Sequence, residues 1–488
     1  MEKFKDNKKQ IIIFNVLIIM AFILTLQNVC MPIGQRMNYS DSSIYQYIGS
    51  IMLKGKMPYI DAFDHKGPIL YLINMIGCLI NIRWGIWLID LIFMSGIMMY
   101  AYKLSNKFLN SEAALIVVLI IMPIISRGYW IGNTPDFYAT FFIMVATYLL
   151  VDYYMNGELE KKSCLVIGGC IALVFWMKQN LIIPIGILCL FILMDNVIKK
   201  KYRVFVRCII CASIGFVLPT VLIGIWLGEK NVLNSMIKDY FEFNFLYASS
   251  QCTRLQQLNA LIEFLHLPSL ALVCLAGIIY WIIKLIYGDM NKRNDYMGIY
   301  QIVFCISLYG CIMAGRPYQQ YPLILYPIII VIMSLTVKCC IIYDSKYVKI
   351  FMLTSLVFII YSIVIPNFQT MMKNQINNLS SIEEDKIVCD TINQNAEEDD
   401  TIAVVSADHC GYYLATQHEA ATKYPYIQVM FYNDKNFWKK YIDELNKSNP
   451  QIIIWNNNWK IDDYLNEYIK SYKEIKKTDR LIVYSRIK

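Results

Sequence analysis

The sequence predicts an all-α polytopic membrane protein that ends in a small α/β domain. Of its 488 residues, 57% are hydrophobic and 17% are charged, whereas a soluble domain carries about a quarter charged residues. Apolar runs long enough to cross a ~30 Å hydrocarbon core as helices recur up to residue 366, after which the composition becomes polar. The net charge of +8 comes mainly from Lys and Arg at the ends of these runs. These observations argue against a soluble enzyme or a nucleic-acid-binding protein.

About eleven apolar runs are predicted to span the membrane as helices. They are residues 11–30, 84–102, 112–127, 136–155, 163–178, 181–198, 204–228, 268–287, 297–315, 319–337 and 347–366. The apolar run 68–81 is predicted to lie in the membrane interface instead, because a span there would invert every later loop and remove the charge bias of the connections.

Lys and Arg residues in the connections predict the orientation of the chain. With the N-terminus in the cytoplasm, the connections that are richest in these residues all fall on the cytoplasmic side. An odd number of spans then places the tail outside the cytoplasm. We therefore expect a multi-pass plasma-membrane protein in which residues 1–366 form a transmembrane module, with an external loop at 31–83, and residues 367–488 form an extracytoplasmic domain.

The tail is predicted to contain three strands with amphipathic helices between them. The strand-like segments are Thr401–Ser406, Gln451–Trp455 and Leu481–Tyr484. Nearly all of the 15 cysteines lie in apolar segments and are expected to behave as small hydrophobic residues. Only Cys389 and Cys410 fall in a polar region, where they could form a disulfide, although the sequence gives no support for one.

The first external loop contains a predicted helix over Ser40–Lys54. Its apolar residues recur three or four positions apart, as in a helix that lies flat in the interface. They are Ile44, Tyr47, Ile48, Ile51 and Met52. Ser40 or Asp41 begins this helix, and Gly55 and Pro58 end it. Asp41 is either a simple helix cap or a carboxylate of a site, held ionised by the positive end of the helix.

A cluster of titratable residues follows in the same loop, directly before the apolar run 68–81. They are Asp61, Asp64, His65 and Lys66. Charged groups at membrane level are energetically costly and usually functional. Two carboxylates beside basic groups suggest a site for a phosphorylated lipid, in which a carboxylate activates a nucleophile and a cation holds the phosphate. The alternative is a solvated surface loop with snorkelling lysines.

Positive residues also lie at the external ends of later spans, against the orientation bias. They are Arg83, Arg127, Lys178 and Arg316. A bound anion near the outer interface would explain their convergence on one side with Lys66, whereas isolated arginines at helix ends often only anchor to lipid headgroups.

Asp136, in the second external loop GNTPDFYATFF, is a further candidate. It either caps the fourth span, following Pro135, or belongs to the site. If it faces Asp41, the pair could position an acceptor or a divalent cation. The histidines are too far apart in sequence to predict a zinc site.

In their order along the chain, these motifs resemble those of the GT-C superfamily of membrane glycosyltransferases, in the branch of the protein O-mannosyltransferases and the lipid A aminoarabinose transferase. The matching segments are DSSIYQYIGSIMLKGKMPY with Asp41, HKGPILY, GNTPDFY with Asp136, WMKQN at 176–180 and GRPYQQYPLILYP at 315–327. They cover most of residues 1–366, and SADHCGYYLATQ in the tail is similar to the small external domain of many bacterial members.

The resemblance implies transfer of a hexosyl or pentosyl group from a polyprenyl-phosphate carrier to a hydroxyl of a glycan, lipid or protein at the outer face of the membrane. Asp41 and Asp136 would be the catalytic carboxylates. The residues assigned to the carrier phosphate and the substrate are Asp64, His65, Lys66, Lys178, Arg316 and Tyr321. The first loop reads Asp-Ser where many relatives have two adjacent acids, so no metal is implied there. HKGP has Gly where aminoarabinose transferases often have Pro, so that substrate is not implied either.

Two other functions are compatible with a chain of many spans. A flippase for polyprenyl-linked saccharides, or another transporter, would be expected to show internal symmetry and charges near the bilayer centre. A membrane scaffold that presents the tail to partners would not require the arrangement of Asp41 and Lys66. The loop 229–267, rich in aromatic residues, could form an acceptor groove or lie in the interface.

Overall fold

The computed structural model describes most of the chain and divides it into two compact units. The described residues are 2–32, 37–129, 132–249, 252–265, 268–286, 296–342, 379–405, 409–428, 431, 434–456 and 463–487. One unit, here called the helical unit, comprises Met1–Gln27, Asp90–Ile225 and Ala248–Gln369. The other, called the loop–tail unit, comprises Asn28–Ile89, Trp226–Tyr247 and Thr370–Lys488. The loop at residues 31–83 therefore belongs to the same compact unit as the tail.

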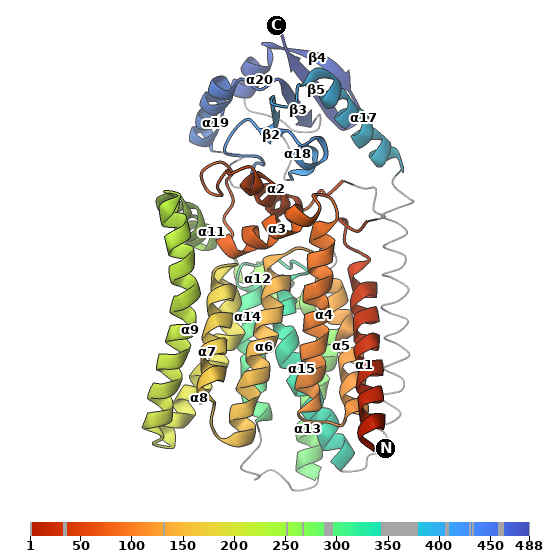
Figure 1. Cartoon of the computed structure of the whole chain (residues 1–488), viewed down its shortest axis with the longest axis vertical. Coiled ribbons are helices and arrows are strands. Elements are labelled where there is room, and N and C mark those ends of the chain that lie inside the picture. The colour runs from red at the N-terminus through yellow and green to blue at the C-terminus, as the bar shows by residue number, and fades with distance from the viewer. Residues whose placement is uncertain are drawn as a thin grey trace. The chain divides into compact units, whose positions relative to one another are not determined.

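The helical unit is a bundle whose long helices run side by side in Figure 1. Its helices are α1 (Glu2–Thr25), α4 (Gly85–Asn106), α5 (Ser111–Gly128), α6 (Pro135–Asn156), α7 (Lys161–Phe175), the 3₁₀ helix η1 (Gln179–Ile182), α8 (Ile183–Ile198), α9 (Tyr202–Glu229), α12 (Arg254–Leu265), α13 (Pro268–Ile286), α14 (Met297–Ile312), the 3₁₀ helix η3 (Tyr321–Leu325) and α15 (Tyr326–Ile342). The stretch Tyr321–Ile342 is 83% buried, the highest value among the long apolar helices of the described residues. Since α15 contacts α5, α6, α13 and α14, it forms the centre of the bundle.

The helices confirm that the chain is a polytopic membrane protein. Within the described residues, seven stretches are long and apolar enough to cross a membrane. They are Lys8–Thr25, Gly85–Asn106, Ser111–Gly128, Pro135–Asn156, Gln179–Ile198, Tyr202–Glu229 and Tyr321–Ile342. The predicted spans 163–178, 268–287 and 297–315 also coincide with helices, but these have fewer than 20 residues each. The predicted span 347–366 lies outside the described residues, so the count of eleven stays a prediction.

Two short helices of the loop at residues 31–83 pack against each other in the loop–tail unit. They are α2 (Asp41–Leu53) and α3 (Pro68–Ile80). The 13 residues of α3 rise about 20 Å, which is short of a ~30 Å hydrocarbon core and agrees with the prediction that this run does not span. The helix predicted over Ser40–Lys54 is confirmed as α2, and its residues Ser42–Gly49 are all buried within the protein. That α2 lies flat in the membrane interface stays a prediction.

The tail and α3 together bury α2. The backbone N–H of Cys410 donates to Ser43 Oγ at 2.9 Å, and that of Ala420 donates to the Tyr47 hydroxyl at 2.8 Å. On the side of α3, Gly49 lies directly against the backbone at Asn74. The apolar spacing of α2 therefore reflects packing inside the loop–tail unit.

We expect Gly49→Ala to destabilise the loop–tail unit. An added Cβ would come within 2.6 Å of backbone atoms of Asn74 and Met75, so α2 and α3 would have to separate, at about 1–3 kcal/mol. Gly186→Ala in α8 is the matched control, because a Cβ there meets nothing within 4 Å and Ala is the better helix former by about 1 kcal/mol. Thermal unfolding of the purified protein checks this, and equal midpoints for the two variants would contradict it.

The tail folds around a sheet of five strands in the order β2-β1-β3-β5-β4. They are β1 (Thr401–Val404), β2 (Glu419–Ala420), β3 (Ile452–Asn456), β4 (Tyr472–Lys477) and β5 (Leu481–Arg486). β1 pairs in parallel with β2 and β3, and β5 pairs antiparallel with β3 and β4. The three predicted strands are confirmed. The sequence missed both edge strands, since β2 has only two residues and β4 reads YKEIKK, which is mostly charged.

Four helices accompany the sheet, as predicted for an α/β tail. They are α17 (Leu379–Asn395), α18 (Gly411–Thr416), α19 (Lys435–Ser448) and α20 (Asp463–Ile469). α19 packs against α20, and α17 packs against β5 and α18. Cys389 and Cys410 are free thiols, so the disulfide that the sequence left open is not formed.

The core of the tail includes side chains from two other parts of the chain. Phe63 of the first external loop is 4% exposed and packs with Tyr424, at 5.5 Å between ring centres. Phe243, which begins α11 (Phe243–Ser249), packs against both Phe63 and Phe431. Asp239, in the π-helix η2 (Ile237–Glu242) that follows α10 (Leu233–Met236), pairs with Lys423 at 2.8 Å. Part of the loop 229–267 is thus a structural support of the tail.

Candidate functional site

Asp41 is the first residue of α2 and is exposed, whereas the rest of its first two turns is buried. Ser40 precedes it in an extended conformation, as a residue at a helix N-cap does. The backbone N–H groups at a helix start attract negative charge, so this position suits a carboxylate. Because the side chain of Asp41 is exposed and those of the following helix residues are buried, Asp41 can contact a substrate and they cannot.

The position of Tyr45 relates Asp41 to Lys66. Tyr45 lies one helical turn after Asp41, so the two residues share a side of α2, and the Tyr45 ring centre is 6.0 Å from Lys66 Nζ. Lys66 contacts His65, which in turn lies beside Asp64. Asp41, Lys66 and Asp64 therefore belong to one neighbourhood within the loop–tail unit.

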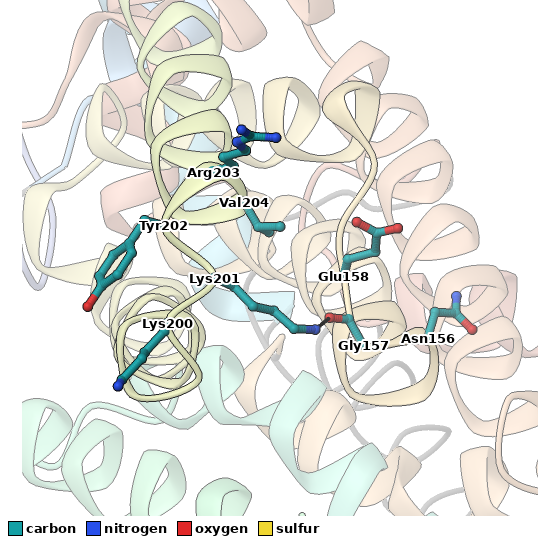
Figure 2. Close-up of a pocket in the computed structure, with 8 residues that line it drawn as sticks. All are labelled: Asn156, Gly157, Glu158, Lys200, Lys201, Tyr202, Arg203 and Val204. Carbon is teal, nitrogen blue, oxygen red and sulfur yellow. Dashed lines mark hydrogen bonds between the residues drawn. The ribbon is translucent and has the colours of Figure 1, made fainter.

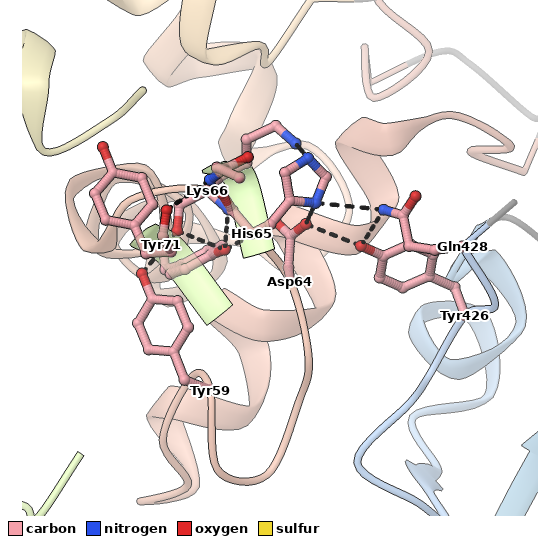
Figure 3. Close-up of polar contacts among 9 residues, drawn as sticks. Tyr59, Asp64, His65, Lys66, Tyr71, Tyr426 and Gln428 are labelled. Carbon is pink, nitrogen blue, oxygen red and sulfur yellow. Dashed lines mark hydrogen bonds and ion pairs between the residues drawn. The ribbon is translucent and has the colours of Figure 1, made fainter. Parts of the chain in front are cut away.

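Asp64 is the most enclosed group of this neighbourhood, with 1% of its side chain exposed (Figure 3). Its two carboxylate oxygens accept hydrogen bonds from the Tyr71 hydroxyl at 2.8 Å and the Tyr426 hydroxyl at 2.9 Å. The Nδ1 atom of His65 is 3.4 Å from the oxygen that Tyr426 contacts. Burial alone would raise the pKa of Asp64, but the Lys66 charge and the hydrogen bond from the Tyr71 hydroxyl help to outweigh it, and that pKa is lowered. Asp64 is therefore a buried anion.

Lys66 carries the positive charge that balances Asp64. Its Nζ lies 2.6 Å from His65 Nε2, so the imidazole stands between the ammonium and the carboxylate. The backbone carbonyl of Lys66 accepts a hydrogen bond from the Tyr59 hydroxyl at 2.7 Å. Gly67 and Pro68 follow and start α3, which fixes the loop at this point. An ammonium held in this way can contact an anionic group.

The helical unit contains a second cluster of predicted site residues. Asp136 is in the first turn of α6 and 2% exposed, and Lys178, between α7 and η1, donates to both its carboxylate oxygens at 3.1 and 3.2 Å. Lys178 Nζ also lies 4.4 Å from the ring centre of Tyr321, where η3 begins. The structure therefore brings Asp136, Lys178 and Tyr321 together. Arg316 is exposed in the segment before η3.

Asp90, in α4, is a polar residue of the helical unit that the sequence analysis did not select. Its carboxylate is fully buried and accepts hydrogen bonds from the Tyr129 hydroxyl at 2.7 Å, the Tyr138 hydroxyl at 2.6 Å and the Asn133 backbone N–H at 2.9 Å. These partners flank the loop that leads into Asp136, so Asp90 holds that loop in place. A single acidic residue within the apolar segment GIWLIDLIF was the signal that could have identified it.

Two pockets lie outside these clusters. One of 760 Å³ in the helical unit is lined by Asn156, Gly157, Glu158, Lys200, Lys201, Tyr202, Arg203 and Val204 (Figure 2). Lys201 Nζ donates there to the Gly157 carbonyl at 3.1 Å. This is the connection whose positive residues set the predicted orientation. A second pocket, of 540 Å³, lies in the loop–tail unit beside Asn38 and Asp385. Among the described residues, no three His, Cys, Asp or Glu side chains gather closely enough to hold a metal ion.

The fold is similar to that of several solved membrane proteins. ArnT from Cupriavidus metallidurans bound to undecaprenyl phosphate matches with a TM-score of 0.63 and 11% identity, over 98% of this chain and 98% of that chain. ArnT in the apo state matches with a TM-score of 0.49 and 8% identity, over 99% and 98%. The oligosaccharyltransferase AglB from Archaeoglobus fulgidus, in complex with an inhibitory peptide and a dolichol-phosphate, matches with a TM-score of 0.44 and 13% identity, over 92% and 70%.

The likeness to ArnT spans both the helices and the tail, and it shows that the chain shares the fold of that protein, as the resemblance of its motifs implied. The chain belongs to the family described as "Putative competence-induced protein Ccs4 N-terminal domain", which matches residues 3–361. No curated protein matches the sequence.

Proposed function

We propose that this protein is a membrane glycosyltransferase that moves a sugar, hexosyl or pentosyl, from a polyprenyl-phosphate carrier to an acceptor hydroxyl. One observation carries the proposal. In the loop–tail unit, the Lys66 ammonium lies on the same side of α2 as the exposed Asp41. It contacts His65, which pairs with the buried Asp64. The GT-C fold supports it, since ArnT, which shares that fold, was solved with bound undecaprenyl phosphate.

The reaction requires one proton acceptor and one group that stabilises negative charge. The bond between the anomeric carbon and the phosphate oxygen breaks, and its electron pair stays on the carrier phosphate. The acceptor oxygen forms the new bond to that carbon and gives up its proton. We assign the proton to the Asp41 carboxylate, and the added charge on the phosphate to Lys66. Asp64 and His65 keep Lys66 in place.

The cluster of the helical unit receives its own assignments. We assign Asp136 as a second carboxylate of the reaction, and Lys178, Arg316 and Tyr321 as groups that hold the carrier phosphate. The ion pair between Lys178 and Asp136 supports these assignments, because it places a cation and a carboxylate next to each other at the ends of helices. That Asp136 and Asp41 act on one substrate stays a prediction.

The location of the reaction follows from the orientation of the chain. We propose that the N-terminus is cytoplasmic and that the tail lies outside the cytoplasm, so transfer occurs at the outer face of the membrane. The acceptor is then a glycan, lipid or protein of the cell envelope. The positive charge of the connection 199–207 supports this orientation.

Lys66→Gln tests the phosphate assignment without knowledge of the sugar or the acceptor. Undecaprenyl phosphate is the probe, and its binding to the purified full chain is measured by native mass spectrometry or by tryptophan fluorescence. A charge-assisted hydrogen bond contributes about 1.5–3 kcal/mol, so we expect binding about 10- to 100-fold weaker.

Lys54→Gln is the matched control, because Lys54 is 52% exposed and pairs at the surface with Glu419 at 3.4 Å. It should bind the carrier like the wild type. Equal binding by Lys66→Gln and the wild type would remove Lys66 from the site, and a wild type that binds no carrier would overturn the proposed function itself.

A further inference from the structure

We propose that Tyr426 of the tail is a positioning residue for Lys66 and acts through Asp64 and His65, so that the tail completes the phosphate site. This inference rests on the proposed function. It adds a residue that no motif of the sequence indicated, from a part of the chain 362 positions away from Asp64.

Tyr426 is itself held in one hydrogen-bonding state. Its hydroxyl is buried, accepts a hydrogen bond from Gln428 Nε2 at 2.8 Å and donates to Asp64 Oδ1 at 2.9 Å (Figure 3). Since Gln428 supplies a donor, the single phenolic proton is directed to the carboxylate. The second carboxylate oxygen of Asp64 is occupied by the Tyr71 hydroxyl. The carboxylate is therefore fixed by one tyrosine of the loop and one of the tail.

The position of Asp64 determines the state of His65. An ammonium can only donate hydrogen bonds, so the contact of 2.6 Å between Lys66 Nζ and His65 Nε2 makes Nε2 the acceptor. A neutral imidazole then carries its proton on Nδ1, which lies 3.4 Å from Asp64 Oδ1. Gln428 Nε2 lies at the same distance from Nδ1, but directs its closer hydrogen bond to Tyr426. Tyr426 thus donates to Asp64 and Lys66 donates to His65, and the 3.4 Å between His65 Nδ1 and Asp64 Oδ1 brings the two pairs into contact.

The surroundings hold the imidazole at this place. The backbone carbonyl of His65 accepts a hydrogen bond from Asn244 Nδ2 at 2.7 Å, and its ring lies 5.3 Å from that of Phe243. The backbone N–H of Phe63 donates to the Lys423 carbonyl at 2.7 Å, which attaches the loop to the tail segment that contains Tyr426. The tail therefore fixes both the backbone before Asp64 and the side chain of Asp64.

The contact with His65 restricts where the Lys66 ammonium can point. A lysine side chain has four rotatable bonds and would otherwise lose much conformational freedom when it binds a phosphate. Anchoring Nζ to a fixed imidazole removes part of that loss before the carrier arrives. Removal of the Tyr426 hydroxyl leaves Lys66 in place but loosens the group that orients it.

Nitrogen-15 NMR of histidine-labelled protein in lipid tests the chain without any activity. The protein has four histidines, and His65→Asn identifies the signals of His65 by their loss. We expect His65 to be neutral with the proton on Nδ1, and we expect Tyr426→Phe to shift its Nδ1 signal. Tyr468→Phe, which removes a hydroxyl bonded to the Leu445 carbonyl at 3.1 Å elsewhere in the tail, should leave it unchanged.

Binding of undecaprenyl phosphate to the same full-length variants is the second readout. Tyr426→Phe should bind about three- to tenfold more weakly than the wild type, the size expected of a residue that acts through two others, and Gln428→Leu should show the same trend. An Nδ1 signal that Tyr426→Phe leaves unshifted, or wild-type binding by both variants, would overturn the inference. A wild type that binds no carrier but shows the expected histidine signals would overturn the proposed function and leave the chain of contacts intact.

Discussion

Replacing Asp41 with Asn is expected to lower the rate of sugar transfer by about 10²–10⁴-fold, the range of a general base. The exchange keeps the size of the side chain and removes its ability to take a proton from the acceptor hydroxyl. Because Asp41 is exposed at the start of α2 and Lys66 is intact, the fold and the binding of the carrier should be preserved. The loss should therefore appear in kcat and not in the affinity for undecaprenyl phosphate.

Asp61→Asn is the control for Asp41→Asn. Asp61 lies in the same loop, but its carboxylate accepts a hydrogen bond from the Met57 backbone N–H at 2.7 Å and closes a local turn. It should transfer sugar within a few fold of the wild type. Undiminished transfer by Asp41→Asn would show that the base is another residue.

Replacing Lys178 with Met is expected to lower both the stability of the protein and the rate of sugar transfer. Lys178 is 18% exposed and is paired with Asp136, which is 2% exposed. Removal of one partner of a buried ion pair leaves an uncompensated charge and costs about 3–5 kcal/mol. Thermal unfolding in detergent should therefore show a large decrease in the midpoint, together with loss of transfer.

The double variant Asp136→Asn with Lys178→Met separates a structural role from a functional one. Without a buried charge to compensate, it should regain most of the lost stability and still fail to transfer sugar. The pair Lys9 and Glu112 is the control, since these side chains are 44% and 73% exposed and neutralising both should change little. A double variant that regains stability and transfer together would make Lys178 and Asp136 purely structural.

Hydropathy predicted the helices of this protein well, because about 20 apolar residues are the direct requirement for crossing a membrane. The strands β1, β3 and β5 were equally readable, since each is a short, mostly apolar run that the tail buries. The helix α2 was predicted from the spacing of its apolar residues and not from the length of an apolar run. Its apolar spacing indicated burial correctly, but spacing alone cannot tell a lipid surface from α3 and a tail that lies hundreds of residues away.

The residues that carry charge were also partly predictable. Asp64, His65, Lys66, Asp136 and Lys178 stood out because charged groups are rare beside apolar runs. Tyr426 did not, since a tyrosine in a polar tail is an ordinary residue until its hydroxyl is placed against Asp64. The partners of a buried carboxylate are set by the tertiary fold, and sequence patterns within one loop do not contain them.

Sugar transfer by this protein is tested by following a polyprenyl-phosphate sugar in membrane vesicles that contain the full chain. A set of such donors, each with a labelled sugar, is incubated with the wild type and with Asp41→Asn, and the lipid and its sugar are then separated. We predict that the wild type releases polyprenyl phosphate from at least one donor and transfers the label to an acceptor, and that Asp41→Asn does not. A wild type that leaves every donor uncleaved, or only moves it intact across the bilayer, would contradict the account.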